Sequence, residues 1–267
     1  MKKHFSTVIL IVILIAGLSL LLYPTVSDYW NSFHQSRAIS NYTEQVEQMD
    51  TAEQRQEIEK ARVYNEELRH NNNRYDMNEA QEKEYDSLLN LSGSSMMGYI
   101  EIPSIDCHLP IYHGMSQEVL QVGVGHLKGS SLPVGGEGTH SVLTAHRGLP
   151  SATLFTNLDK LAEGDYFILH TMGETLTYEV DQILTVLPGE MEALNIEEGK
   201  DYCTLVTCTP YGVNSHRMLV RGHRTANQAK YLVKEDAKQI NTSLVSLCIA
   251  GPIFLILFIG TMIRHRK

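Results

Sequence analysis

The chain has few of the residues that cross-link small domains or bind metals. It has four cysteines, one tryptophan and eight prolines in 267 residues. Four cysteines in this length do not make a disulfide scaffold, and no CxxC or HxxxH spacing supplies a zinc site. Basic residues are also scarce, because 22 lysines and arginines face 31 acidic residues, for a net charge of −9. This excludes a general nucleic-acid binder, which needs a basic face to displace counterions from phosphates.

Charge is absent altogether from two long runs near the ends of the chain, 5–23 and 244–263. A helix rises about 1.5 Å per residue, so each run is about 30 Å long, the thickness of a bilayer's hydrocarbon core. Lysines precede the first run, and the tail 264–267 carries three basic residues. Basic residues stay on the cytoplasmic side. We therefore predict a multi-pass membrane protein in contact with lipid through two transmembrane helices, with cytoplasmic ends 1–4 and 264–267 and an extracellular part between the spans.

Other interpretations of the two apolar runs remain open. The first could be a cleaved signal peptide, but it is longer than the usual 7–15 apolar residues, and Tyr23–Ser27 is not a clear small-x-small cleavage site. We favour an uncleaved anchor. In the second run, Gly251 and Pro252 kink a helix without stopping it from crossing. Because a lipid-anchor signal does not normally end in four polar residues, this run is interpreted as a membrane span.

Residues 24–96 are predicted to be a helical spacer that holds the rest of the extracellular part off the membrane. Apolar residues recur at helical spacing up to Met49, and a second helix is predicted to start near Asp50, with Thr51 and Gln54 as its capping box, and to end near His70. Residues 71–96 are polar, with a short helix predicted over 79–89.

The hydrophobic period changes to two from Gly98 onward, which is typical of strands. Strands bounded by Gly, Pro, Asn or Asp are predicted at 99–103, 105–112, 141–146, 166–171, 175–187, 203–209 and 218–223, and short helices at 118–122 and 152–161. Many short strands with few helices indicate a mainly β fold, a closed or nearly closed barrel over 97–225. A juxtamembrane linker, 226–243, then leads to the second span.

Cys208 is the cysteine best placed for chemistry. It ends an apolar strand before a Thr-Pro-Tyr-Gly turn, which leaves the strand end accessible. Cys203 shares the strand but is five residues away, so the two side chains point to opposite faces. We interpret Cys203 and Cys107 as buried apolar residues, and Cys248 lies within the second apolar run.

Arg217 is expected to lie beside Cys208 if the strands on either side of the turn form a hairpin. Arg221 shares the face of Arg217 but is about 13 Å further along the strand, so we choose Arg217 over Arg221 and Arg224. A guanidinium next to a thiol can stabilise a thiolate or a developing oxyanion.

A thiol nucleophile also needs a proton partner, which His146 could provide. It ends the strand Ser141–His146 just before a Gly/Pro loop, a position suited to the rim of a site. Four other histidines of the β region have no distinguishing neighbours and are interpreted as surface or structural residues: His108, His113, His126 and His170. From the residues alone, His146 remains one candidate among several.

Three segments together resemble the active-site motifs of sortases. They are Thr204–Cys208 (TLVTC), Leu143–Gly148 (LTAHRG) and an arginine nine residues after the cysteine. Three further segments, Gly98–Pro103, Leu109–Gly114 and Thr207–Gly212, resemble the class C, pilin-polymerising group. The resemblance implies an eight-stranded sortase β-barrel with N-terminal helices. It also implies Cys208 as the nucleophile, His146 as its proton partner and Arg217 as the third catalytic residue, with neither a cofactor nor a metal.

The same resemblance implies a reaction, partners and a location. The enzyme would cleave an LPXTG-like sorting signal between Thr and Gly and join the acyl group to a lysine of another pilin subunit, at the surface of a Gram-positive bacterium. Class C enzymes often carry an Asp-Pro-aromatic lid over the site. The corresponding residues here are Asp76, Met77 and Asn78, so a lid formed by Asp76 and Met77 is one expectation and an ordinary polar linker the other.

Three alternatives remain on sequence grounds. A housekeeping sortase would attach proteins to cell-wall precursor, although the second span and the long helical spacer speak against it. A secreted cysteine endopeptidase would use the same dyad with water as the acceptor. A receptor or adhesin would hold the three residues by coincidence.

Overall fold

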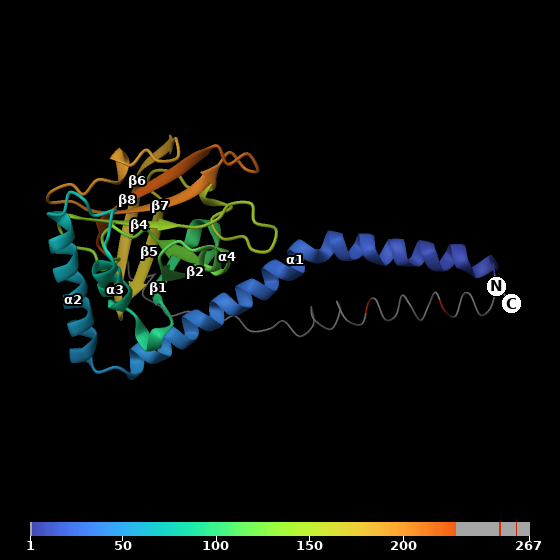
Figure 1. Cartoon of the computed structure of the whole chain (residues 1–267), viewed down its shortest axis with the longest axis horizontal. Helices are drawn as coiled ribbons and strands as arrows, with labels where there is room; N and C mark the ends of the chain where they lie inside the picture. The colour runs from blue at the N-terminus through green and yellow to red at the C-terminus, as the bar shows by residue number, and fades with distance from the viewer. Residues whose placement is uncertain (1, 228–250, 252–259, 261–267) are drawn as a thin grey trace. The chain divides into compact units, whose positions relative to one another are not determined.

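The computed structural model describes residues 2–227, 251 and 260 (Figure 1). The second predicted span, 244–263, lies outside the described residues except for its positions 251 and 260, as do the tail 264–267 and all but the first two residues of the predicted linker 226–243. The described residues include all of the predicted barrel, 97–225, and all of the helical spacer before it, 24–96.

Helix α1, Lys2–Gln48, is one continuous helix that contains the first apolar run (Figure 1). Its most apolar 18-residue window has a mean hydropathy of 2.6 with no part buried in the protein, so the helix is long and apolar enough to cross a membrane. The helix does not end at Tyr23 but passes through Pro24. Residues after Pro24 keep helical periodicity, and Ile39, Tyr42 and Val46 are buried against the rest of the protein.

Helix α2 spans Thr51–Arg69, and its N-cap residue is Asp50, one residue before the cap that the sequence predicted. The capping box is formed by Asp50 and Glu53, not by Thr51 and Gln54. Asp50 has extended backbone angles and its carboxylate accepts from the backbone N–H of Ala52 at 3.0 Å. Gln54 instead donates to the carbonyl oxygen of Val46 at 2.6 Å and so ties α2 back to α1.

Eight strands close into a barrel in the order β1-β2-β3-β4-β7-β8-β6-β5. Their bounds are β1 Met96–Ile102, β2 Cys107–His113, β3 Val124–His126, β4 Thr139–Thr144, β5 Tyr166–Thr171, β6 Glu174–Val186, β7 Asp201–Thr209 and β8 His216–Thr225. Neighbours are antiparallel except β2 with β3 and β4 with β7, which are parallel. The predicted mainly β barrel is thus confirmed, and the three-residue strand β3 is the one that the sequence pattern was too short to indicate.

The short helices and turns agree with prediction except at one place. Helix α3, Glu79–Ser87, and helix α4, Gln117–Val122, are where they were expected. Single 3-10 turns lie at η1 Leu91–Gly93, η2 Pro103–Ile105, η3 Leu158–Lys160 and η4 Glu192–Leu194. The helix predicted over 152–161 is wrong apart from η3. The backbone N–H of Phe155 donates to the carbonyl oxygen of His146, 3.1 Å away, and is therefore not available for a helical bond.

One buried amide fixes helix α2 to the barrel. Asn65 is 2% exposed, and its side chain donates to the carbonyl oxygen of Leu132 at 3.1 Å and accepts from the backbone N–H of the same residue at 2.7 Å. Both polar groups of the amide are satisfied by one backbone unit. An apolar replacement would leave that buried N–H and C=O without partners, which is the costly form of a lost hydrogen bond.

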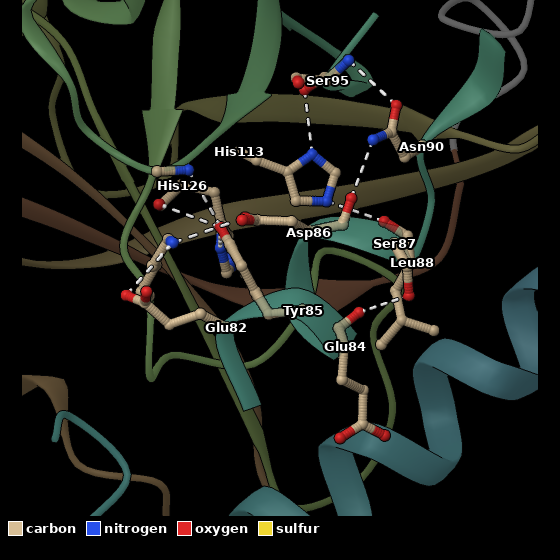
Figure 2. A network of polar contacts seen from close by, with 12 residues as sticks. Glu82, Glu84, Tyr85, Asp86, Ser87, Leu88, Asn90, Ser95, His113 and His126 are labelled. Carbon is tan, nitrogen blue, oxygen red and sulfur yellow. Dashed lines mark hydrogen bonds and ion pairs between the residues drawn. The ribbon is translucent and has the colours of Figure 1, made fainter. Parts of the chain in front are cut away.

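Helix α3 is fixed to the barrel by the polar network in Figure 2. The His126 ring donates from Nε2 to the carbonyl oxygen of Ser131, 2.8 Å away, which leaves Nδ1 to accept from the Tyr85 hydroxyl at 2.9 Å. The backbone N–H of Gly114 donates in turn to that hydroxyl oxygen. The His113 ring lies 2.8 Å from the carbonyl oxygen of Leu88. Residues 79–88 are thus held by a network inside the protein rather than only by surface contacts.

Two buried histidines predict acid sensitivity: His126 in this network, and His140, whose ring contacts the carbonyl oxygen of Asn195 and the hydroxyl of Thr204 elsewhere in the barrel. Burial lowers the pKa of His126 to about 4, and burial also lowers the pKa of His140 to about 4. Both rings are neutral in the fold, while the unfolded chain takes up protons below pH 6.5. The stability is therefore complete above pH 6.5 and is lost as the pH falls toward 4, by about 3 kcal/mol for each ring. Thermal melting followed by circular dichroism between pH 7 and 4 measures the loss. In His126→Gln the pH dependence should fall by about half, and an unchanged dependence would contradict this assignment.

Candidate active site

Cys208 and Arg217 lie side by side next to the turn of a hairpin. Strands β7 and β8 pair in a register in which Cys208 is directly opposite Arg217. The turn between them occupies residues 210–215. The hairpin expected from the sequence is therefore present, in the expected register. Both side chains are half-buried, which leaves the sulfur and the guanidinium accessible to a ligand.

His146 reaches the same end of the sheet from the other side of β7. Strand β4 runs parallel to β7, and Thr144 is opposite Val206. The two chains stay together for one more residue, because the backbone N–H of Ala145 donates to the carbonyl oxygen of Val206 at 3.2 Å and the Thr207 hydroxyl donates to the carbonyl oxygen of Ala145 at 2.8 Å. His146 and Cys208 are the next residues of their chains, so they emerge at adjacent positions.

The alternation of side chains places Cys208 and Arg217 on one face of the sheet. Cys203 and Leu205 of β7 point into the main hydrophobic core, and Val206 packs in a second cluster on the opposite face. Cys208 is in phase with Val206, and Arg217 is in phase with Leu219, another member of that second cluster. Cys208 and Arg217 thus share the face that is turned away from the main core, and His146 follows the end of β4 by two residues.

An apolar cluster adjoins Cys208 and Arg217 on this face. Its centre is formed by Val142, Leu194 and Leu219, and it extends through Leu127, Leu184, Val186, Met191, Ala193 and Val206. Strands β4, β6, β7 and β8 supply most of these side chains. Met191, Ala193 and Leu194 come instead from the β6–β7 loop, residues 187–200, which packs onto the sheet beside the site. The three central residues are buried, whereas Val186, which pairs with Arg217, and Val206 are only partly buried.

The loops that carry His146 and Cys208 are joined to each other. The Arg147 guanidinium donates to the hydroxyl of Thr209 at 3.2 Å and pairs with Asp159. Gly148 has a φ of +74°, and a Cβ there would lie 2.9 Å from the ring of Tyr211. Only glycine allows both this backbone conformation and the close approach of the tyrosine ring.

The other two candidate arginines are engaged elsewhere. Arg221 donates to both carboxylate oxygens of Asp181, at 3.0 and 3.2 Å, and lies over the ring of Tyr202. Arg224 donates to backbone carbonyl oxygens, including that of Thr177. Arg217 donates to the carbonyl oxygens of Asn214 and His216 at 3.2 and 3.0 Å, two bonds within its own turn. This leaves the rest of its fork of N–H groups to face a ligand.

Two further cysteines and two of the histidines in the described part of the chain have structural positions, and Cys248 lies outside the described residues. Cys107 and Cys203 are free thiols inside the protein, as expected, and burial raises the pKa of Cys107 to about 12 and that of Cys203 well above its ordinary value. His113 and His126 lie in the network of Figure 2. Within residues 7–227, no group of three or more His, Cys, Asp or Glu side chains is arranged to hold a metal ion.

Asp76 and Met77, the possible lid, make contacts within their own segment and with helix α2. Asp76 is exposed and accepts from the side-chain amide of Asn73 at 3.4 Å. Met77 lines a hollow of about 200 Å³ together with Tyr64 and Leu68 of helix α2. Among the ion pairs of the described residues, none joins Asp76 to Arg217.

Residues just before this segment make a contact that the sequence did not indicate. Arg74 is only 9% exposed, lies over the ring of Tyr75 and donates to the carbonyl oxygen of Leu194 at 3.2 Å. Gly129, with a φ of +87°, gives room for this turn, since a Cβ there would lie 2.5 Å from the carbonyl oxygen of Arg74. Arg74 thereby fastens the β6–β7 loop next to the site. A single arginine in a polar segment carries no local signal for such a role.

Comparisons with known proteins agree on one family. Residues 100–225 match the sortase domain. The structure is similar to sortase C1 from Streptococcus agalactiae, with 50% identity, a TM-score of 0.70 and coverage of 72% of this chain and 100% of that chain. It is also similar to Clostridium perfringens sortase C with the C-terminal cell wall sorting motif, at 46% identity and a TM-score of 0.64, covering 72% of this chain and 99% of that chain.

Curated relatives are more distant. Sortase D of Bacillus subtilis is 33% identical over 131 residues, which are 48% of this chain and 63% of that protein. Sortase A of Bacillus anthracis is 29% identical over 140 residues, which are 52% of this chain and 65% of that protein. The chain thus spans somewhat less than two thirds of the length of these relatives. With the near-complete coverage of the sortase C structures, these likenesses establish that the chain belongs to the sortase family of cysteine transpeptidases.

Proposed function

We propose that this protein is a class C sortase anchored in the cell membrane, which polymerises pilin subunits through isopeptide bonds. The observation that carries the proposal is the strand register, which sets Cys208 opposite Arg217 and pairs the end of β4, two residues before His146, with the end of β7. The likeness to sortase C structures from several bacteria supports the choice of class. The apolar α1 supports the membrane anchor.

In the first half of the proposed reaction the Cys208 thiolate attacks the carbonyl carbon of the Thr–Gly bond in an LPXTG-like signal. The carbonyl oxygen becomes an oxyanion, which the Arg217 guanidinium and a backbone N–H near Cys208 would stabilise. His146, as imidazolium, gives its proton to the leaving glycine amine as the C–N bond breaks. The product is a thioester between the sulfur and the threonine carbonyl, and the released chain carries the new amino terminus.

The second half returns the enzyme to its starting state. A lysine amine of the next pilin attacks the thioester carbonyl and loses a proton to the neutral His146. The carbon–sulfur bond then breaks, which frees the thiolate and leaves an isopeptide bond. The partly buried members of the apolar cluster, among them Val186 and Val206, would offer the aliphatic residues of the signal an apolar contact near the sulfur.

Replacing the sulfur tests the covalent step. Cys208→Ala should form no acyl-enzyme with a sorting-signal peptide and no linked pilin, because no other described cysteine is accessible. Mass spectrometry of the intact enzyme after mixing with peptide gives the adduct directly. Cys203→Ala is the matched control and should still form the thioester. Linked pilin made by Cys208→Ala would refute the assignment.

The acceptor decides between a transpeptidase and an endopeptidase. With wild-type enzyme and peptide, hydroxylamine or a lysine-bearing pilin should capture the acyl group at the expense of hydrolysis. A product that is always the free acid, whatever the amine concentration, would favour the endopeptidase. Transfer to cell-wall precursor but never to a pilin lysine would favour a housekeeping sortase.

Arg217 is expected to act in the transition state rather than in binding. Arg217→Lys keeps the charge but loses the planar fork of donors, so kcat for the sorting peptide should fall on the order of 100-fold with little change in KM. Arg221→Lys is the control on the same strand and face, since a lysine there still pairs with Asp181. A loss of activity in Arg221→Lys equal to that in Arg217→Lys would count against the assignment.

Arg74 is expected to act on binding, through the β6–β7 loop. Arg74→Ala removes a buried, charge-assisted hydrogen bond to Leu194, so the loop is less well ordered before the peptide binds. We expect KM for the sorting peptide to rise about tenfold while kcat stays within twofold. Arg69→Ala, which removes an exposed ion pair with Glu66 in helix α2, should change neither. A drop confined to kcat would contradict this role.

A further inference from the structure

The extracellular half of helix α1 contacts the loop that follows His146. The Asn31 side chain donates to the carbonyl oxygen of Ser151 at 2.7 Å. The backbone N–H of Thr153 donates to the carboxylate of Asp28 at 2.6 Å. Asp28 and Asn31 are three residues apart, so they lie on the same face of the helix. Two hydrogen bonds thus join the membrane-proximal turns of α1 to a loop of the candidate active site.

Hydrogen bonds join the far end of this loop to His146 and Gly148. Only a few residues therefore separate His146 from the contact with α1. Phe155 donates its backbone N–H to the carbonyl oxygen of His146 at 3.1 Å, and Gly148 donates its own to the hydroxyl of Thr156 at 3.1 Å. Thr153 is two residues from Phe155. The backbone of His146 therefore lies within about 10 Å of the Thr153 N–H that Asp28 holds.

Further along, α1 is fastened to the barrel itself. Gln35, 7% exposed, donates to the carbonyl oxygen of Val122 at 3.0 Å. The buried Tyr42 hydroxyl donates to the carbonyl oxygen of Met97 at 2.8 Å and accepts from the backbone N–H of Met172 at 2.9 Å. The helix therefore cannot swing away from the barrel without breaking several buried contacts, and it leaves the barrel on the side of α4 (Figure 1).

The position of the apolar run on α1 then limits the height of the site. The run ends at Tyr23, and Asp28 follows five residues later, which is about 7.5 Å along a helix. Exposed aromatic side chains, Tyr23 at 56% and Trp30 at 62%, bracket this stretch, as is typical of a membrane–water interface. The length of the path from Tyr23 to His146 is the greatest height that His146 can have above the end of the apolar run, whatever the tilt of the helix. With about 6 Å more for the Asp28 side chain and its hydrogen bond, His146 lies no more than about 24 Å above the end of the run.

We propose that α1, which stays helical through Pro24, is a ruler that holds the active site close to the membrane, so that the enzyme takes sorting signals cleaved near the bilayer. An extended chain covers about 3.3 Å per residue, so a spacer of about seven residues between the bond to be cut and the substrate's own membrane-spanning segment is enough to reach the site. The ruler rests on the transpeptidase function proposed above and on α1 crossing the membrane.

Helical insertions test the ruler directly. The full-length enzyme is reconstituted in liposomes with a reporter protein that carries an LPXTG motif, a spacer of seven residues and a membrane-spanning segment. Inserting 7 or 14 helix-forming residues between Val26 and Ser27 lifts the barrel by about 10 or 21 Å. We expect acylation with the seven-residue spacer to fall at least tenfold for the longer insertion. Lengthening the reporter's spacer by eight residues should restore it.

Two controls separate the ruler from other effects. An insertion of 14 flexible Gly/Ser residues at the same place has the same length but lets the barrel return to the surface, so it should keep most activity. All variants should cleave a soluble LPXTG peptide at the wild-type rate. Equal activity of the helical and flexible variants on the seven-residue spacer would overturn the ruler. Failure of the wild type to cleave the soluble peptide would overturn the proposed function instead.

Discussion

The pairing of β7 with β4 on one side and β8 on the other is the constraint on which the candidate site depends. Parallel pairing carries Cys208 to the level of His146, and antiparallel pairing puts Arg217 opposite the sulfur. A shift of one residue in either register would turn one member of the set to the opposite face. The register is protected by burial, because the alternate positions Cys203, Leu205 and Val220 fill the main core.

The part of this arrangement that depends on short-range pattern could be predicted. Alternation places Cys203 and Cys208 on opposite faces, and a single turn between two strands brings Arg217 to Cys208. His146 could not be chosen from the residues alone, because β4 and β7 pair over a long separation and their parallel register leaves no local signal. The choice of His146 came instead from the resemblance of Leu143–Gly148 to a sortase motif.

Features that the sequence did not predict depend likewise on contacts between residues far apart in the chain. Pro24 interrupts one helical hydrogen bond, yet α1 continues, because buried contacts at Tyr42 and Gln35 stabilise its second half. The loop that was expected to be helical at 152–161 is organised by bonds to His146 and to α1, which lie far away in sequence. The contact of Arg74 with Leu194 joins two irregular segments. Each of these depends on partners that only the folded barrel brings near.

The separation of the two strands also bears on when the thiol becomes reactive. Ala145 and Thr207, which join the ends of β4 and β7, are 62 residues apart. Contacts of such long range form late, since the entropy of closing the loop must be met first. Until β4 and β7 have paired, Cys208 lacks the neighbours that the proposed mechanism requires. On that mechanism, the thiol gains its catalytic reactivity only in the finished barrel.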